Sequence, residues 1–362
     1  MDRFKLSDGY SISRVIKGSW QLAGGHGPVD PSAAIAGMRD HVEAGITTFD
    51  CADIYTGVEE LIGRFLRDHA DVFRAGELLP VQVHTKCVPD LDRLAALREC
   101  DVVATVDRSL RRLGVERLDL VQLHWWDFGI PGHVEAAHWL ARLRRAGKIR
   151  LIGLTNADVP RLREVVEAGV PIASNQVQYS VLDRRPQGAM TSFCRERGIS
   201  LLCYGTVAGG LLGDRYLGAP EPASDAKDEN RSLTKYRLIV DEFGGWNLYQ
   251  DLLRTLSSIA VKHGASIAQV ATRYVLDRPC VGAAIVGARN DRHLAETRRL
   301  FDLLLDAEDL ARIAEIVDRA SGPSGPIYGL ERTPGGRHAV IMRTDLQRPD
   351  RGQAPSNSAP AR

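Results

Sequence analysis

Four side chains able to take part in proton transfer lie at or just beyond the ends of separate apolar runs: Asp50, Tyr55, Lys86 and His124. A tyrosine hydroxyl, with an ordinary pKa near ~10, donates a proton poorly at neutral pH unless a nearby cation stabilises its phenolate. Lys86 can supply that cation, and Asp50 can supply the carboxylate that keeps a partly enclosed lysine charged. His124 can then offer an imidazole N–H to a carbonyl oxygen. The four residues, called the tetrad below, predict protonation of a carbonyl oxygen while a hydride reaches its carbon.

Short apolar runs alternate along the chain with longer segments of helical period. This alternation predicts βαβ units and a parallel sheet. Eight runs are expected to be strands, the number that closes a (β/α)8 TIM barrel, and in such a barrel the C-terminal strand ends converge on the face where active sites are built. The expected strands are 15–19, 47–50, 81–86, 118–124, 149–155, 172–176, 200–204 and 282–286, and helices are expected at 31–44, 58–69, 101–113, 134–146 and 307–320.

Three segments depart from this rhythm. Residues 4–6 and 10–12 flank the turn 7–9, which predicts a β-hairpin at the N-terminal mouth of the barrel. Residues 205–246 form a long seventh βα loop, expected to be a mobile excursion beside the site. The sequence thus predicts a single catalytic barrel domain over 1–320 and a C-terminal extension over 321–362, whose last dozen residues are expected to be disordered.

Composition excludes several classes of partner. Apolar residues are 44% and charged residues 26% of the chain, typical of a globular protein with a sizeable core. A net charge of +1 gives no reason to expect nucleic acid or an anionic membrane as partner. There is neither a long uninterrupted apolar stretch nor an N-terminal signal pattern, so a cytoplasmic protein is expected. The six scattered cysteines never form the paired spacing of a zinc site, and no metal is expected. The choice between monomer and homo-oligomer stays open.

The motifs around these residues resemble those of the aldo-keto reductases. The matching strings are FDCADIY at 49–55 followed by EELIG at 59–63, TK at 85–86, and DLVQLH at 119–124. The resemblance implies that the tetrad is the family's catalytic Asp, Tyr, Lys and His, with Tyr55 as general acid and base. It implies an enzyme that reduces an aldehyde or ketone with a nicotinamide cofactor.

Further strings are similar to the family's cofactor-binding segments. The resemblance implies that Thr155, Asn156 and Gln176 hold the nicotinamide carboxamide, and that Tyr204, followed by Gly205, stacks on the nicotinamide face. The phosphate end of the cofactor is expected where the last strand passes into a helix, since free backbone N–H groups there can bind an anion. The residues implied at that end are Gly287, Ala288, Arg289, His293, Glu296 and Thr297. Arg289 and His293 add positive charge, which favours NADP over NAD.

The resemblance implies a small carbonyl compound as substrate, and the sequence does not specify which one. Trp20, Trp125 and Trp126 are expected to present aromatic surface over the pocket, although a Trp-Trp pair can also be core packing. Other dehydrogenase and hydrolase motifs are missing from the sequence, including G-x-G-x-x-G after a strand and G-x-S-x-G. The alternative function is a nucleotide-sensing regulatory subunit, which would keep the same barrel and cofactor site with little turnover.

Overall fold

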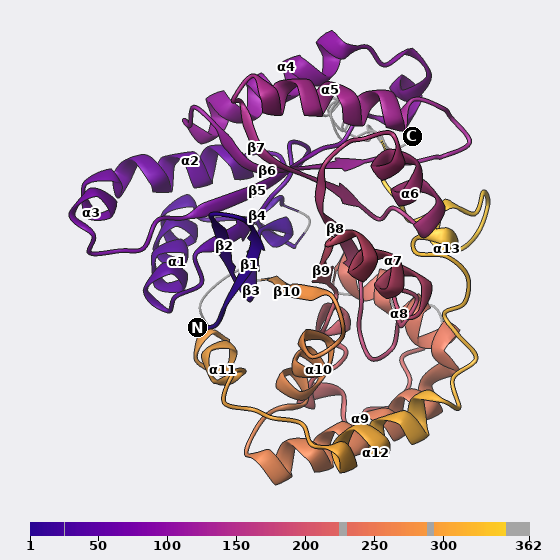
Figure 1. Cartoon of the computed structure of the whole chain (residues 1–362). Helices are drawn as coiled ribbons and strands as arrows, with labels where there is room; N and C mark the ends of the chain where they lie inside the picture. The colour runs from indigo at the N-terminus through magenta and orange to yellow at the C-terminus, as the bar shows by residue number, and fades with distance from the viewer. Residues whose placement is uncertain (25, 224–229, 288–292, 345–362) are drawn as a thin grey trace, which may run out of the picture.

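Eight parallel strands close into a barrel in the computed structural model, which describes residues 1–24, 26–223, 230–287 and 293–344. Strand follows strand around the barrel in chain order, and β10 closes it by pairing with β3 (Figure 1). The predicted (β/α)8 architecture is therefore confirmed. The barrel strands are β3 (Val15–Gly18), β4 (Thr48–Asp50), β5 (Gln82–Cys87), β6 (Leu118–His124), β7 (Ile149–Thr155), β8 (Ile172–Gln178), β9 (Ser200–Tyr204) and β10 (Val281–Gly287).

Helices surround the barrel and cover its outer face (Figure 1). Their starts follow local sequence signals, as in the helix that begins at Pro31, where the Asp30 side chain caps the first free N–H groups. The helices are α1 (Pro31–Glu43), α2 (Val58–Asp68), α3 (Ala70–Ala75), α4 (Glu99–Leu113), α5 (His133–Arg145), α6 (Val159–Glu167), α7 (Ala189–Arg197), α8 (Arg231–Phe243), α9 (Gly245–His263), α10 (Ile267–Leu276), α11 (Leu294–Arg299), α12 (Ala307–Val317) and α13 (Gly329–Arg332). Short 3-10 turns lie at η1 (Trp20–Leu22), η2 (Leu91–Ala96), η3 (Ala208–Gly210) and η4 (Asp214–Tyr216).

The predicted hairpin is present as β1 (Arg3–Ser7) and β2 (Tyr10–Ser13). Its side chains Leu6, Tyr10 and Ile12 join one buried cluster with inward-facing barrel residues such as Leu120 and Leu202. This apolar plug fills the N-terminal half of the barrel, so the polar residues that follow it on the strands gather at the C-terminal half.

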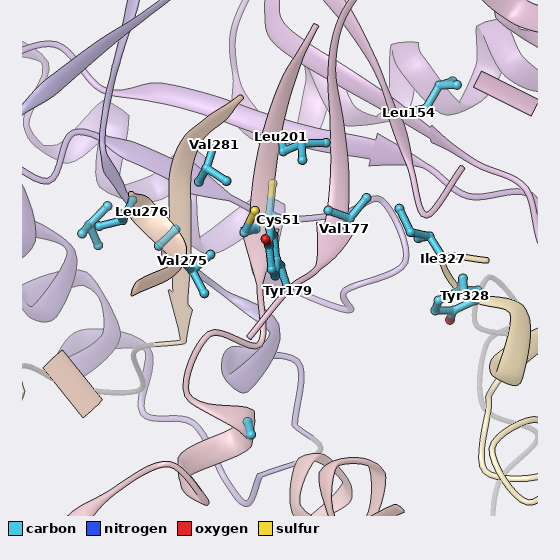
Figure 2. Packing of buried hydrophobic residues seen from close by; sticks show 14 of the residues in the cluster. Cys51, Leu154, Val177, Tyr179, Leu201, Val275, Leu276, Val281, Ile327 and Tyr328 are labelled. Carbon is cyan, nitrogen blue, oxygen red and sulfur yellow. The ribbon is translucent and has the colours of Figure 1, made fainter. Parts of the chain in front are cut away.

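A second, larger core lies between the barrel and its helices. It takes the outward-facing residues of the strands, because successive strand residues point to opposite faces. Figure 2 shows part of this packing, with Val177 of β8 and Leu201 of β9 on neighbouring strands and Tyr179 directly after β8. Ile327 and Tyr328, on the segment that leads into α13, belong to the same core, so part of the C-terminal extension packs against the barrel domain.

The seventh βα connection is long, as predicted, but it contains the thirteen-residue helix α8. The buried residues Leu233, Tyr236, Val240 and Phe243 recur at helical spacing, and the Asn230 side chain caps the first turn by accepting from the Leu233 N–H. Across the described residues, no helix is both long and apolar enough to cross a membrane.

Candidate active site

Asp50 and Lys86 form a buried ion pair at the ends of neighbouring strands β4 and β5. Lys86 Nζ lies 2.6 Å from Asp50 Oδ2 and also donates to the Cys51 carbonyl at 2.8 Å. Burial lowers the pKa of Lys86, but the Asp50 carboxylate and the Tyr55 hydroxyl more than offset burial and hold this pKa above its ordinary value. The lysine is therefore an ammonium at neutral pH.

Amide side chains from two further strands hold the other oxygen of Asp50. Gln176 Nε2 donates to Asp50 Oδ1 at 2.6 Å, and Gln122 Nε2 donates to the same oxygen at 3.3 Å. The two glutamines are also linked to each other at 3.2 Å. Side chains from three other strands, β5, β6 and β8, thus bind the Asp50 carboxylate.

Tyr55 follows β4 in the loop before α2 and lies beside this ion pair. The Lys86 ammonium is 5.1 Å from the centroid of its ring. Burial raises the pKa of Tyr55, and Lys86 opposes this effect without overcoming it. The hydroxyl therefore stays protonated at neutral pH, which is the form that a proton donor needs. Lys86 lowers the pKa of Tyr55, as expected, but the combined effect of burial and the neighbouring charges is to raise it.

His124 ends β6 and is buried on the same face. Burial, followed by the charge of Arg332, lowers its pKa to about 3, so the imidazole is neutral. Its Nδ1 contacts the Thr155 carbonyl at 3.3 Å, a long hydrogen bond in which the carbonyl can only accept. Rings of Trp126 and Tyr328 stand edge-on to the imidazole, with centroids at 4.3 Å and 5.6 Å. Aromatic side chains thus contact two members of the tetrad, Trp20 at Tyr55 and Trp126 and Tyr328 at His124.

The residues expected at the nicotinamide lie on the same face, at the ends of β7, β8 and β9. Tyr204 donates its hydroxyl to Asn156 Oδ1 at 2.9 Å. Asn156 adopts a left-handed backbone with φ of 56°, a conformation that asparagine tolerates better than most residues. Thr155 Oγ1 is buried without a hydrogen-bond partner in the described part of the chain. Gly205 has φ of 74° and no room for a Cβ, which would collide with the Tyr236 hydroxyl.

The phosphate end is described only in part. Gly287 ends β10 with the Gln21 amide in the space where a Cβ would stand. His293 occupies the N-cap position of α11 without a side-chain capping bond. Its Nδ1 lies 3.6 Å from Glu296 Oε2, and Thr297 Oγ1 donates to the His293 carbonyl. The expected contacts of Ala288 and Arg289 fall outside the described residues.

The three tryptophans have different surroundings. The Trp20 ring lies 5.0 Å from the Tyr55 ring, and Trp126 contacts His124 as described above. Trp125 is buried in the outer core, where its Nε1 donates to the Ile130 carbonyl at 2.9 Å. Of the adjacent pair, Trp126 is the one that contacts the tetrad.

Sequence reasoning missed the contribution of the C-terminal segment. Arg332 of α13 donates to the backbone carbonyls of Trp125, Trp126 and Asn156 at 2.9 Å, 3.0 Å and 3.0 Å. These bonds fasten the segment to the loops that follow β6 and β7. These bonds hold Tyr328 against His124, and no local sequence motif predicts this contact.

A buried ionic network fastens the same segment to β8 and α8. Arg185 pairs with Asp183 at 2.7 Å and with Glu331 at 3.1 Å, and the side chains of all three are at most 2% exposed. Gln178, at the end of β8, donates to Asp183 at 2.7 Å, and Lys235 of α8 lies 3.7 Å from Glu331. Burial acts to raise the pKa of Glu331, but Lys235 and Arg185 lower it to about 2.

Comparisons with known proteins agree with this arrangement. A model of the aldo/keto reductase family matches residues 14–318. Aldo-keto reductase YhdN of Bacillus subtilis (strain 168) is 27% identical over 338 residues, covering 91% of this chain and 97% of the relative. Aldo-keto reductase yakc of Schizosaccharomyces pombe, whose name specifies NADP(+), is 25% identical and covers 88% of this chain and 91% of its own length.

A solved structure supports the fold. Glycerol dehydrogenase AKR11B4 from Gluconobacter oxydans superposes with a TM-score of 0.73 at 24% identity, covering 90% of this chain and 98% of the other. The chain belongs to the aldo/keto reductase family. It is therefore an oxidoreductase of a family that uses nicotinamide cofactors and acts on small carbonyl compounds.

Proposed function

We propose that this chain is an NADPH-dependent reductase that converts an aldehyde or ketone to an alcohol, with Tyr55 as the general acid. The observation that carries the proposal is the contact set around Lys86: an ammonium 2.6 Å from Asp50 and 5.1 Å from the Tyr55 ring, beside the neutral imidazole of His124. These groups provide a proton donor and a means to stabilise the charge left on it.

The residues at the strand ends fit a nicotinamide cofactor. Hydrogen-bonding atoms of Ser19, Thr155 and Gln178 are buried there without partners among the described residues. A carboxamide has donors and an acceptor that can satisfy such atoms. When bound, the reduced cofactor would supply the hydride. The choice of NADPH rests on the basic residues near Gly287 and on the NADP(+) in the name of one relative.

In this mechanism Tyr55 donates its proton to the carbonyl oxygen. The raised pKa keeps the hydroxyl protonated until the oxygen becomes basic, and the Lys86 ammonium then stabilises the phenolate that remains. Asp50 holds Lys86 in place while Gln122 and Gln176 hold Asp50. Oxidation of an alcohol follows the same path in reverse, with Tyr55 as the base.

His124 orients the carbonyl oxygen toward Tyr55. Because the neutral ring carries one N–H, the proton must sit on Nε2 for the imidazole to donate to the substrate. The Nδ1 contact with the Thr155 carbonyl requires the opposite tautomer, and its length of 3.3 Å makes it a weak bond to give up. We therefore propose that carbonyl binding selects the tautomer with the proton on Nε2.

The test is consumption of NADPH by the purified chain with a panel of aldehydes, ketones and quinones. We expect turnover of at least one carbonyl compound, and oxidation of the matching alcohol with NADP+. Tight NADPH binding by calorimetry with no turnover across the panel would instead favour the nucleotide-sensing subunit. Absence of both binding and turnover would refute the proposal.

A further inference from the structure

Three cations near the tetrad, Lys86, Arg185 and Arg332, have close oxygen partners among the described residues. Lys86 has a carboxylate and a backbone carbonyl within 2.8 Å. Arg332 donates to three backbone carbonyls. Arg185 is bidentate toward each of two carboxylates. Lys235 differs from these three.

The Lys235 ammonium is surrounded mainly by aromatic faces. Its Nζ lies 5.2 Å, 5.7 Å and 5.5 Å from the ring centroids of Tyr204, Tyr236 and Tyr328. Its oxygen partner is Glu331, at the long distance of 3.7 Å. Ring faces attract an ammonium but do not accept its three N–H bonds as an oxygen does. With the side chain only 17% exposed, water is a restricted substitute.

This ammonium lies close to residues of the candidate active site. Tyr204 is the residue expected under the nicotinamide, and Tyr328 stands 5.6 Å from His124, so a single ring separates Lys235 from the imidazole. A group bound at Lys235 would thus belong to the substrate, a few bonds from the carbonyl that reaches Tyr55.

We propose that Lys235 binds an anionic group of the substrate, so that the preferred substrates are carbonyl compounds carrying a carboxylate or a phosphate. This inference rests on the proposed function and specifies the substrate class. An anion at Lys235 would complete the coordination of a shielded ammonium, where charge-assisted bonds are stronger than in water.

Glu331 does not block this role, because it has a better partner. Arg185 contacts both of its oxygens, at 3.1 Å and 3.4 Å, both closer than Lys235. When an anion binds the Lys235 ammonium, the Glu331 carboxylate therefore stays paired with Arg185. An unpaired buried carboxylate would make anion binding unfavourable. Arg185 is in turn held by Asp183, which accepts from Gln178.

The experiment compares matched aldehydes in the wild type and in Lys235→Met. The pairs are succinic semialdehyde against butanal, and glyceraldehyde 3-phosphate against glyceraldehyde, which also distinguish carboxylate from phosphate. We expect kcat/KM for the anionic member of at least one pair to fall roughly 10- to 100-fold, with a small change for the neutral member. Lys235→Arg should retain most of the preference. Lys262→Met removes an exposed, ion-paired lysine on α9 and serves as the matched control.

Equal losses for charged and neutral aldehydes would assign Lys235 a purely structural role and overturn the inference while the reductase function stands. If the wild type turns over none of the aldehydes, the proposed function fails separately. The anion site is then tested by calorimetric titration with succinate and with inorganic phosphate. Binding that Lys235→Met abolishes supports the site, and binding that is absent or unchanged in the variant refutes it.

Discussion

Asp50→Asn removes the charge of the carboxylate that pairs with Lys86 while keeping its shape. Both partners are only 6% exposed, so the variant leaves a buried ammonium without a counter-ion. Breaking a buried pair by neutralising one partner lowers the free energy of unfolding by about 3–5 kcal/mol. We expect the lower end, about 3 kcal/mol, because the Cys51 carbonyl still accepts from Lys86 at 2.8 Å.

The stability of Asp50→Asn should also depend on pH in a defined direction. In the wild type the pKa of Lys86 is raised, so its stabilisation is fully present below the ordinary lysine pKa and disappears only above it. In Asp50→Asn, the carboxylate that opposed burial most strongly is gone, so we expect burial to lower the pKa of Lys86 below that ordinary value although the Cys51 carbonyl still accepts from it. The folded variant then binds fewer protons than its unfolded chain, and its stability must rise with pH between roughly 7 and 10.

The assay is urea unfolding followed by circular dichroism at several pH values, with Glu43→Gln as control. Glu43 forms an exposed pair with Arg39 at 2.8 Å, so its loss should change stability by no more than about 0.5 kcal/mol and add no such slope. A variant Asp50→Asn as stable as the control, or one whose stability is flat with pH, would refute the assignment of Lys86 as a buried ammonium.

Three further predictions concern other parts of the site. For His124, the pKa of about 3 means that kcat/KM should show no titration of this ring between roughly pH 5 and 8. The contribution of the neutral ring to the free energy of unfolding is present above pH ~6.5 and is lost as the pH falls toward 3. A His124→Gln variant that loses as much stability as the wild type over that range would contradict this. Arg332→Ala should speed amide hydrogen exchange of residues 327–333 by more than about 10-fold while the melting temperature changes little, because three charged donors are lost locally; unchanged exchange would show that Arg332 does not fasten the segment. Arg289→Ala should weaken NADPH binding about 10-fold and leave NADH nearly unaffected, as measured by cofactor fluorescence; equal losses would remove the 2′-phosphate role.

Much of the barrel could be predicted because its signals are local. Residues 118–124, 149–155 and 200–204 were expected as strands with the bounds that β6, β7 and β9 have. Each run is apolar and ends near a polar residue, as buried parallel strands do before they reach the C-terminal face. The rule that this face carries the chemistry is what allowed residues far apart in sequence to be grouped.

Gln122 was missed although the sequence contained a signal for it. Leu120, Gln122 and His124 alternate along β6 and point into the barrel, with Leu120 in the inner core. Residues two positions apart on a strand point to the same face, so a polar residue two positions before His124 is expected to face the active site. The same rule applied to β8 connects Gln176 with Gln178.

Lys235, Tyr328, Glu331 and Arg332 lacked any such signal. Glu331 meets Arg185 across 146 residues, and Arg332 meets Trp125 across 207. Contacts of this range depend on how the C-terminal segment crosses the barrel face, which no periodicity or turn motif specifies. Helix α8 was missed for a different reason: its apolar spacing is regular, but charged residues and prolines before it favoured a loop.

Single-turnover reduction by Tyr55→Phe tests the central claim most directly. The best carbonyl substrate is mixed with the enzyme–NADPH complex, and Tyr274→Phe on α10, a buried tyrosine of the outer core, is the matched control. We predict that Tyr55→Phe binds NADPH normally but reduces the substrate about 10²- to 10⁴-fold more slowly, the range expected for loss of a general acid, while the control matches the wild type. A Tyr55→Phe enzyme that reduces the substrate at the wild-type rate would contradict the account.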